Sequence, residues 1–195
     1  KIKRYHHIIF NILFIIILGL ESARQAVASL KKGRRIEELE QFALNDSMTG
    51  FYNRNAYDYF IYNEKNIKNY MVVTFDLNNL KMCNDNYGHS SGDAYIIHSA
   101  HIIETTFDRF GKCYRIGGDE FCCLIPDAAE FQIERFIQKM QQDIAILNNK
   151  NIIPTEVGIA CGYALATPDD ADIEKVRERA DEMMYHNKKV LKGLI

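Results

Sequence analysis

The spacing of apolar residues changes twice along this chain, and each change marks a different kind of structure. Residues 8–20 are almost continuously apolar, and residues 21–44 carry apolar side chains three to four positions apart. From residue 70 onward, short apolar runs bounded by turn residues alternate with stretches of helical spacing. Because short continuous runs favour buried strands and three-to-four spacing favours amphipathic helices, the pattern predicts an N-terminal helical extension followed by a mixed domain.

The predicted elements of that domain follow a definite order. We predict helices over residues 53–67, 78–86, 93–107, 128–147 and 172–191, strands over 70–77 and 155–166, a β-hairpin over 112–125, and a loop over 88–92. From residue 70 the order is strand, helix, strand, strand, helix, strand, which is the split βαβ or ferredoxin-like arrangement. We therefore predict an α+β fold, an α/β sandwich in which a ferredoxin-like βαββαβ core sheet is flanked by helices.

The apolar segment within residues 1–20 has three interpretations. As a helix, residues 8–20 would span about 20 Å, whereas a bilayer core needs about 30 Å. The segment is the end of a transmembrane helix, a buried or oligomer-forming element, or a signal peptide. More basic residues follow the segment than precede it, so in the first case the full-length protein lies in the membrane with its C-terminal domain in the cytoplasm. Because the sequence begins with Lys1, we expect it to be part of a longer protein.

A connecting helix is predicted for residues 21–44. A spacing of three to four residues links Val27, Leu30, Ile36, Leu39 and Ala43, except around Gly33, where the stripe breaks. Such a stripe suits either a solvated linker or signalling helix or a weak coiled-coil seam between two copies of the chain.

Composition adds two constraints. The chain has 47% hydrophobic residues, 26% charged residues and a formal net charge of −2, which indicates a globular protein and gives no support for a nucleic-acid partner. Its five cysteines are an odd number without a C-x-x-C pair, so we predict reduced and mostly buried thiols.

The turn of the predicted hairpin contains two glycines followed by two acidic residues, Gly117-Gly118-Asp119-Glu120. In a ferredoxin-like sheet the first and third strands are antiparallel neighbours, so Asp76 should lie beside Asp119 and Glu120. Clustered carboxylates repel one another unless a cation neutralises them, and their oxygens suit Mg²⁺ or Mn²⁺. Magnesium keeps coordination positions open for phosphate oxygens, so the pattern predicts a nucleoside triphosphate as the ligand.

Further polar residues are candidates for binding that nucleotide. Lys81 follows the first strand, and Lys188 and Lys192 are four residues apart on one face of the last predicted helix, where they could meet phosphates. Asn84 and Asp93 could recognise a guanine edge, because a carboxylate accepts the N1 and N2 hydrogens that adenine lacks. In the alternative interpretation, these two are a loop residue and a helix cap, and the lysines are solvated surface charges.

Four motifs together resemble a known family over about residues 44–193. They are D-S-M-T-G-F-Y-N-R at residues 46–54, F-D-L-N-N-L-K with N-D and G-H-S-S-G-D within 75–93, R-I-G-G-D-E-F at 115–121, and A-D-E-M-M-Y followed by a lysine within 180–188. In this order and spacing they resemble the motifs of the GGDEF-domain family, the diguanylate cyclases. The resemblance implies a GGDEF catalytic domain over residues 45–195 that condenses two GTP into cyclic di-GMP with release of two pyrophosphates.

The resemblance also implies a metal site and a general base. Two Mg²⁺ or Mn²⁺ ions per active site would be held by Asp76, the Leu77 carbonyl, Asp119 and Glu120. Asp119 would also accept the proton of the attacking ribose 3′-hydroxyl. How Asp119 and Glu120 divide these roles stays open at this point.

Substrate-binding roles are implied in the same way. Asn84 and Asp93 would recognise guanine with His89 nearby, Lys81 would stabilise charge on the α-phosphate, and the β- and γ-phosphates would meet two lysines of the last helix, Lys188 and Lys192. Each subunit of a homodimer would hold one GTP, under the control of an upstream sensory domain.

Three departures from the family pattern are visible. Asn78 and Leu80 stand where the family often has aspartate and phenylalanine, and Lys192 stands where arginine is usual. The R-x-x-D motif of product-inhibited members is missing, since the corresponding positions are Asp108 and Gly111, and we expect no such inhibitory site. A catalytically silent GTP- or cyclic-di-GMP-binding regulatory module is the alternative function.

Overall fold

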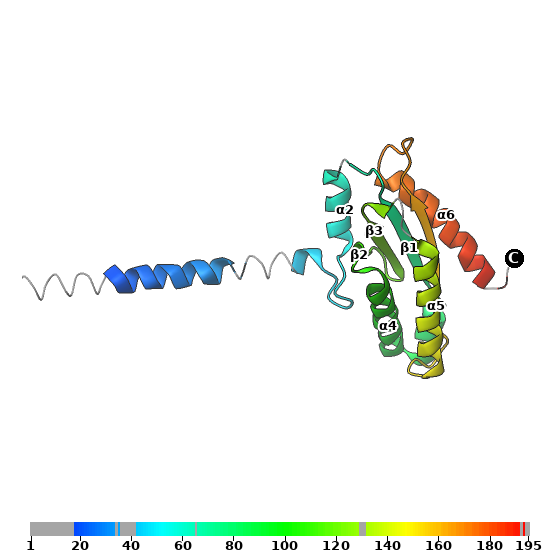
Figure 1. The fold of residues 1–195 in the computed structure, drawn as a ribbon. Helices are drawn as coiled ribbons and strands as arrows, with labels where there is room; N and C mark the ends of the chain where they lie inside the picture. The colour runs from blue at the N-terminus through cyan, green and yellow to red at the C-terminus, as the bar shows by residue number, and fades with distance from the viewer. Residues whose placement is uncertain are drawn as a thin grey trace, which may run out of the picture. The chain divides into compact units, whose positions relative to one another are not determined.

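The structure is a computed structural model that describes residues 18–33, 35, 42–64, 66–128, 132–191 and 193. The chain divides into two compact units, Lys1–Ala43 and Leu44–Ile195. In the first unit, residues 18–33 form a helix with exposed side chains, the blue ribbon of Figure 1. Within the described part of the chain, no helix is long and apolar enough to cross a membrane. The apolar segment predicted at residues 8–20 lies outside the described residues except for positions 18–20.

The second unit is built on an antiparallel sheet. Its described strands are β1 (Met71–Asn78), β2 (Lys112–Arg115), β3 (Glu120–Ile125) and β4 (Gly158–Leu165). The strand order is β2-β3-β1-β4, and each neighbouring pair is antiparallel. This is the predicted order, with the first and third strands adjacent at the centre of the sheet (Figure 1).

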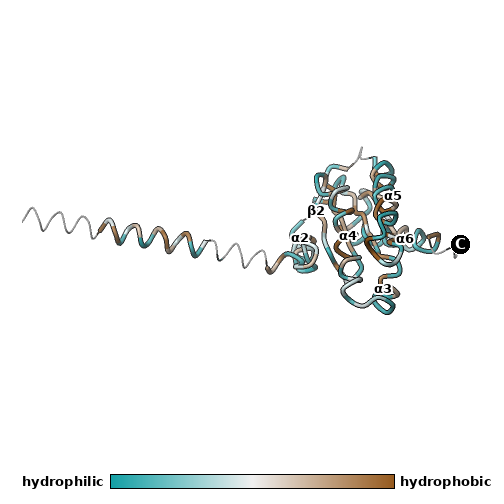
Figure 2. The backbone as a smooth tube through the Cα atoms, turned by 90° about the horizontal axis from the view of Figure 1, so that it is seen from below, coloured by the Kyte–Doolittle hydropathy of each residue, from teal (hydrophilic) through white to brown (hydrophobic). Residues whose placement is uncertain are grey.

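Helices cover both faces of this sheet. They are α2 (Arg54–Asn63), α3 (Leu80–Tyr87), α4 (His89–Phe107), α5 (Ile133–Asn149) and α6 (Ile173–Leu191). One apolar cluster joins alternate residues of β1, including Val73 and Phe75, to α4 and α5, and a second joins Val72 to α2 and α6. Figure 2 shows the hydrophobic colour along α4 in particular. The strand alternation also decides which polar residues of β1 face α6, because Thr74 and Asp76 share the side of Val72.

Both edge strands of the sheet have hydrogen-bonding partners on their outer side. On β2, the Arg115 amide donates to the Tyr52 carbonyl at 2.8 Å, and the Tyr52 amide donates to the Cys113 carbonyl at 3.1 Å. On β4, the Cys161 amide donates to Asn187 Oδ1 of α6 at 3.1 Å. All five cysteines are buried free thiols, as predicted. Burial raises the pKa of the Cys161 thiol to about 12.

One predicted loop is wrong. Residues 88–92 were expected to form a loop before a helix at 93, but α4 already begins at His89. Gly88, with φ 83°, serves both as the C-cap of α3 and as the N-cap of α4, so a single residue makes the turn. Ser90 and Ser91 therefore lie in the first turn of α4. Other boundaries moved by a few residues: α2 ends at Asn63, and α5 begins at Ile133.

Helix α6 lies unusually close to β4 at Gly162. A Cβ atom added to this glycine would lie 2.2 Å from the Ala180 carbonyl oxygen and 2.2 Å from the Met184 amide nitrogen. Because both atoms belong to the helix backbone, no side-chain rotation can make room. We predict that Gly162→Ala lowers the free energy of unfolding by about 1–3 kcal/mol, the usual cost of overpacking.

Chemical denaturation measures this effect, and Gly158→Ala on the same strand is the matched control. A Cβ at Gly158 would meet its nearest neighbour, Asn78, at an ordinary distance of 3.4 Å. Equal stability of the two variants would contradict the close packing of α6 on β4.

Candidate active site

The candidate site lies where the end of β1 meets the start of β3. In the register of the two strands, Asp76 is opposite Glu120. The amide of Leu77 donates a hydrogen bond of 3.0 Å to the Asp119 carbonyl. The topology therefore brings these acidic positions to one end of the sheet, as the element order predicts, and Asp76 faces α6.

The glycine turn before β3 is held from two sides. The amides of Ile116 and Gly117 both donate to the Glu120 carbonyl, at 3.0 and 3.2 Å. The Arg115 guanidinium donates to the Gly118 carbonyl at 2.8 Å and also reaches Asp46 Oδ1 at 3.1 Å. One arginine therefore ties the turn to the segment that precedes α2.

A buried ion pair joins this end of the sheet to the last helix. Lys188 Nζ of α6 lies 2.6 Å from Asp76 Oδ1, and the Asp76 residue is only 7% exposed. That buried oxygen has no well-directed hydrogen bond from the described residues, so the lysine ammonium is its main compensation. A buried carboxylate without such a cation would be strongly unfavourable.

Several predicted site residues surround one cavity of about 450 Å³ next to this pair. Its lining comprises Leu77, Asn79, Leu80, Lys81, Met82, Asp85, Asn86, Asp119 and Lys188. Its size falls within the range of small-ligand sites. The cavity therefore brings together two lysines, one acidic residue of the turn and the end of β1.

The residues predicted to recognise guanine lie outside the lining of this cavity, on α3 and α4. His89 and Asp93 are exposed, and Asn84 is half-buried with its side chain against Gly92. Lys192, the second predicted phosphate ligand of the last helix, lies outside the described residues.

The donor set fits a hard divalent cation in its chemistry. Carboxylate oxygens and a backbone carbonyl are the ligands that Mg²⁺ and Mn²⁺ prefer. Among the residues that the structure describes, however, no three His, Cys, Asp or Glu side chains are grouped closely enough to hold a metal. The Glu120 carboxylate lies close to Gly117, and the Asp76 carboxylate pairs with Lys188, whose ammonium supplies a positive charge at this carboxylate.

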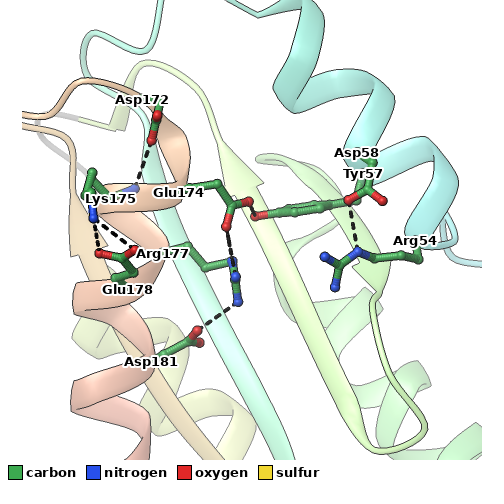
Figure 3. Close-up of polar contacts among 9 residues, drawn as sticks. All are labelled: Arg54, Tyr57, Asp58, Asp172, Glu174, Lys175, Arg177, Glu178 and Asp181. Carbon is green, nitrogen blue, oxygen red and sulfur yellow. Dashed lines mark hydrogen bonds and ion pairs between the residues drawn. The ribbon is translucent and has the colours of Figure 1, made fainter.

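A polar network between α2 and α6 was missed by sequence reasoning (Figure 3). Tyr57 of α2 donates to Glu174 Oε1 at 3.0 Å, and Arg177 donates to Glu174 Oε2 and to Asp181 Oδ2, both at 2.8 Å. Burial acts to lower the pKa of the Arg177 guanidinium, but hydrogen bonds and charge from these acids outweigh it and raise the pKa. Arg177 is three residues from Glu174 and four from Asp181, so helical spacing could have indicated these two ion pairs. No such signal indicates Tyr57, which is 117 residues from Glu174 in the sequence.

These features define the class: an α+β domain in which the glycine–acid turn and lysines from two flanking helices line one cavity. The family described as "Diguanylate cyclase, GGDEF domain" matches residues 43–192. The chain therefore belongs to the GGDEF-domain family.

Two curated relatives and one solved structure illustrate the similarity. Diguanylate cyclase DgcN of Escherichia coli is 31% identical over 157 residues, which is 77% of this chain and 38% of the relative. Diguanylate cyclase DgcS of Shewanella oneidensis is 26% identical over 168 residues, 82% of this chain and 54% of the relative. The chain thus spans about half or less of the length of these relatives.

A crystal structure of the coiled coil and GGDEF domain of DgcB from Caulobacter crescentus, in complex with c-di-GMP, superposes with a TM-score of 0.72. It is 23% identical, and the match covers 86% of this chain and 94% of the DgcB chain. At this identity the likeness establishes the shared fold.

The Asp46–Arg115 pair that anchors the turn should make folding stability depend on pH. Burial acts to raise the pKa of Asp46, but hydrogen bonds from Thr49 and the Arg115 charge outweigh it and lower the pKa below 3.8. A lowered folded-state pKa stabilises the protein above about pH 4, and this contribution is lost as pH falls through the folded-state value. We predict that Asp46→Asn lowers the free energy of unfolding at pH 7 by about 1–3 kcal/mol.

Denaturation of wild type and Asp46→Asn between pH 2 and 7 measures the difference, which should shrink toward low pH. Asp58→Asn is the matched control, because the Arg54–Asp58 pair is more than half exposed on both side chains and such pairs contribute about 0–1 kcal/mol. A difference that stays constant down to pH 2 would count against the lowered pKa.

Proposed function

We propose that this chain is the catalytic part of a diguanylate cyclase, which condenses two GTP into cyclic di-GMP and two pyrophosphates. The observation that carries the proposal is the cavity at the β1–β3 end. There Lys81, Lys188 and Asp119 surround a space next to the buried Asp76 carboxylate. Membership of the family and the named activity of its relatives support the same conclusion.

The reaction needs an oxygen nucleophile, a deprotonating group and charge stabilisation at phosphorus. Asp119 accepts the proton of the ribose 3′-hydroxyl while that oxygen forms a bond to the α-phosphorus of the other GTP. The bond from the α-phosphorus to the bridging oxygen breaks, and pyrophosphate leaves. Lys81 stabilises charge on the α-phosphate, and Lys188 binds the outer phosphates, with Lys192 as the predicted second contact. Positioning and electrostatic stabilisation account for most of the catalysis in such transfers.

Mg²⁺ or Mn²⁺, when bound, would neutralise phosphate charge. Asp76, the Leu77 carbonyl, Asp119 and Glu120 would hold it, and Lys188 would then turn from Asp76 toward the phosphates. The guanine base would meet Asn84 and Asp93, with His89 close by.

A homodimer follows from the chemistry, because each 3′-oxygen has to attack the phosphorus of a second GTP. The helix over residues 18–33 supports this, since Leu20, Val27 and Leu30 are exposed at spacings of seven and three, as in a coiled-coil seam. The catalytic domain lies in the cytoplasm and follows a sensory domain in the full-length sequence. The full-length protein is attached to the membrane.

Asp119→Ala tests the proposed base. We predict that the variant loses at least 99% of cyclic di-GMP formation from GTP and Mg²⁺ or Mn²⁺, measured by product chromatography, because removing an essential base typically costs 10²–10⁴-fold in rate. Asp119 lies in a half-exposed turn, so the unfolding midpoint should stay near that of wild type. A folded, dimeric wild type that binds GTP but forms no product would instead identify the silent regulatory module.

Lys81→Met tests charge stabilisation in the transition state. Lys81 is exposed on the first turn of α3, so we predict an unchanged unfolding midpoint, a KM for GTP within about threefold and a kcat reduced about 10²-fold. Lys68→Met, an exposed lysine outside the cavity, is the matched control and should keep both constants. A rise in KM with unchanged kcat would assign Lys81 to ground-state binding instead.

A further inference from the structure

The two glycines in Gly88-His89-Ser90-Ser91-Gly92 are needed for different reasons. Gly88 has φ 83° and makes the one-residue turn between α3 and α4, while its amide donates to the Asn84 carbonyl at 2.9 Å. Gly92 lies inside α4, in the buried face that packs against α3, and has no unusual φ. Backbone geometry therefore explains Gly88 but leaves Gly92 unexplained.

Space is the reason for Gly92. A Cβ atom at this position would lie 1.9 Å from Asn84 Oδ1 and 2.8 Å from Asn84 Cγ. Real atoms do not approach so closely, so the amide of Asn84 occupies the volume that any other side chain at position 92 would need. The half-buried Asn84 side chain therefore rests on the bare backbone of α4, directly before Asp93.

The nature of the clash distinguishes Gly92 from Gly162 and Gly111. At Gly162 and Gly111 the added Cβ would meet backbone atoms, which cannot move without shifting a helix or a strand. At Gly92 all three nearest atoms belong to the end of one side chain, which can rotate away. Alanine is also a better helix former than glycine. Gly92→Ala should therefore leave the fold intact while displacing the Asn84 amide.

We propose that Gly92 is a positioning residue, which fixes the Asn84 side chain in the orientation that contacts the base of bound GTP. The inference rests on the proposed function, because it takes Asn84 as a base contact. It predicts that Gly92 acts wholly through Asn84, so the two positions are energetically coupled.

A double-mutant cycle tests the coupling with wild type, Gly92→Ala, Asn84→Ala and the double variant. The ligand is 3′-deoxy-GTP, which lacks the attacking hydroxyl, so calorimetry reports a dissociation constant without turnover. We expect Gly92→Ala to weaken binding about tenfold, the usual consequence of losing one hydrogen bond to a bound base. Asn84→Ala should weaken it to a similar degree, and the double variant should bind no more weakly than Asn84→Ala alone. With GTP, the KM should rise in parallel and kcat should change less.

Thermal unfolding supplies the structural control. Gly92→Ala should keep or raise the unfolding midpoint, whereas Gly111→Ala, whose Cβ would lie 2.2 Å from the Leu124 carbonyl oxygen, should lower it. The proposal would be overturned if Gly92→Ala bound 3′-deoxy-GTP as tightly as wild type. It would also be overturned if Gly92→Ala raised the dissociation constant as much in the Asn84→Ala variant as in wild type. A wild type that binds 3′-deoxy-GTP but makes no cyclic di-GMP from GTP would overturn the enzymatic function and leave the cycle valid. A wild type that binds no guanine nucleotide would overturn both.

Discussion

The buried carboxylate of Asp76 sets the main constraint on this domain. It lies near the end of the central strand β1, almost fully covered, and needs a positive charge within contact distance. Lys188 provides that charge from a helix that is the last element of the chain. The ion pair thus makes the geometry of the candidate site depend on the position of α6 relative to β1. Removing the lysine would leave this carboxylate as an uncompensated buried charge.

The position of α6 is in turn fixed by two further features. Gly162 lets the helix backbone lie directly on β4, and the network of Tyr57, Glu174, Arg177 and Asp181 ties its first half to α2. Gly162 sets the distance between α6 and the sheet, and the polar network opposes rotation of α6 about its axis. Together they hold the first half and the middle of α6, while its C-terminal part reaches the site.

The sheet could be predicted from the sequence because it depends on local periodicity and on the order of elements. Apolar runs defined the strands, and the split βαβ order placed Asp76 beside Glu120 without any knowledge of distances. The start of α4 could not be predicted, because Ser90 and Ser91 are as typical of a loop as of a first helical turn, and a single glycine sufficed for the corner. The Tyr57–Glu174 contact was also beyond sequence reasoning, since it joins residues that only the completed packing of two helices brings together. The same holds for Asn84 and Gly92, where a missing side chain gives no signal until its surroundings are known.

The covered edges of the sheet bear on how two such domains can meet. A strand with free amides and carbonyls invites pairing with any other exposed strand. Here the outer side of β2 is occupied by the backbone of Tyr52, and β4 is capped by the Asn187 side chain of α6. Encounters between domains on neighbouring chains are therefore directed away from strand addition.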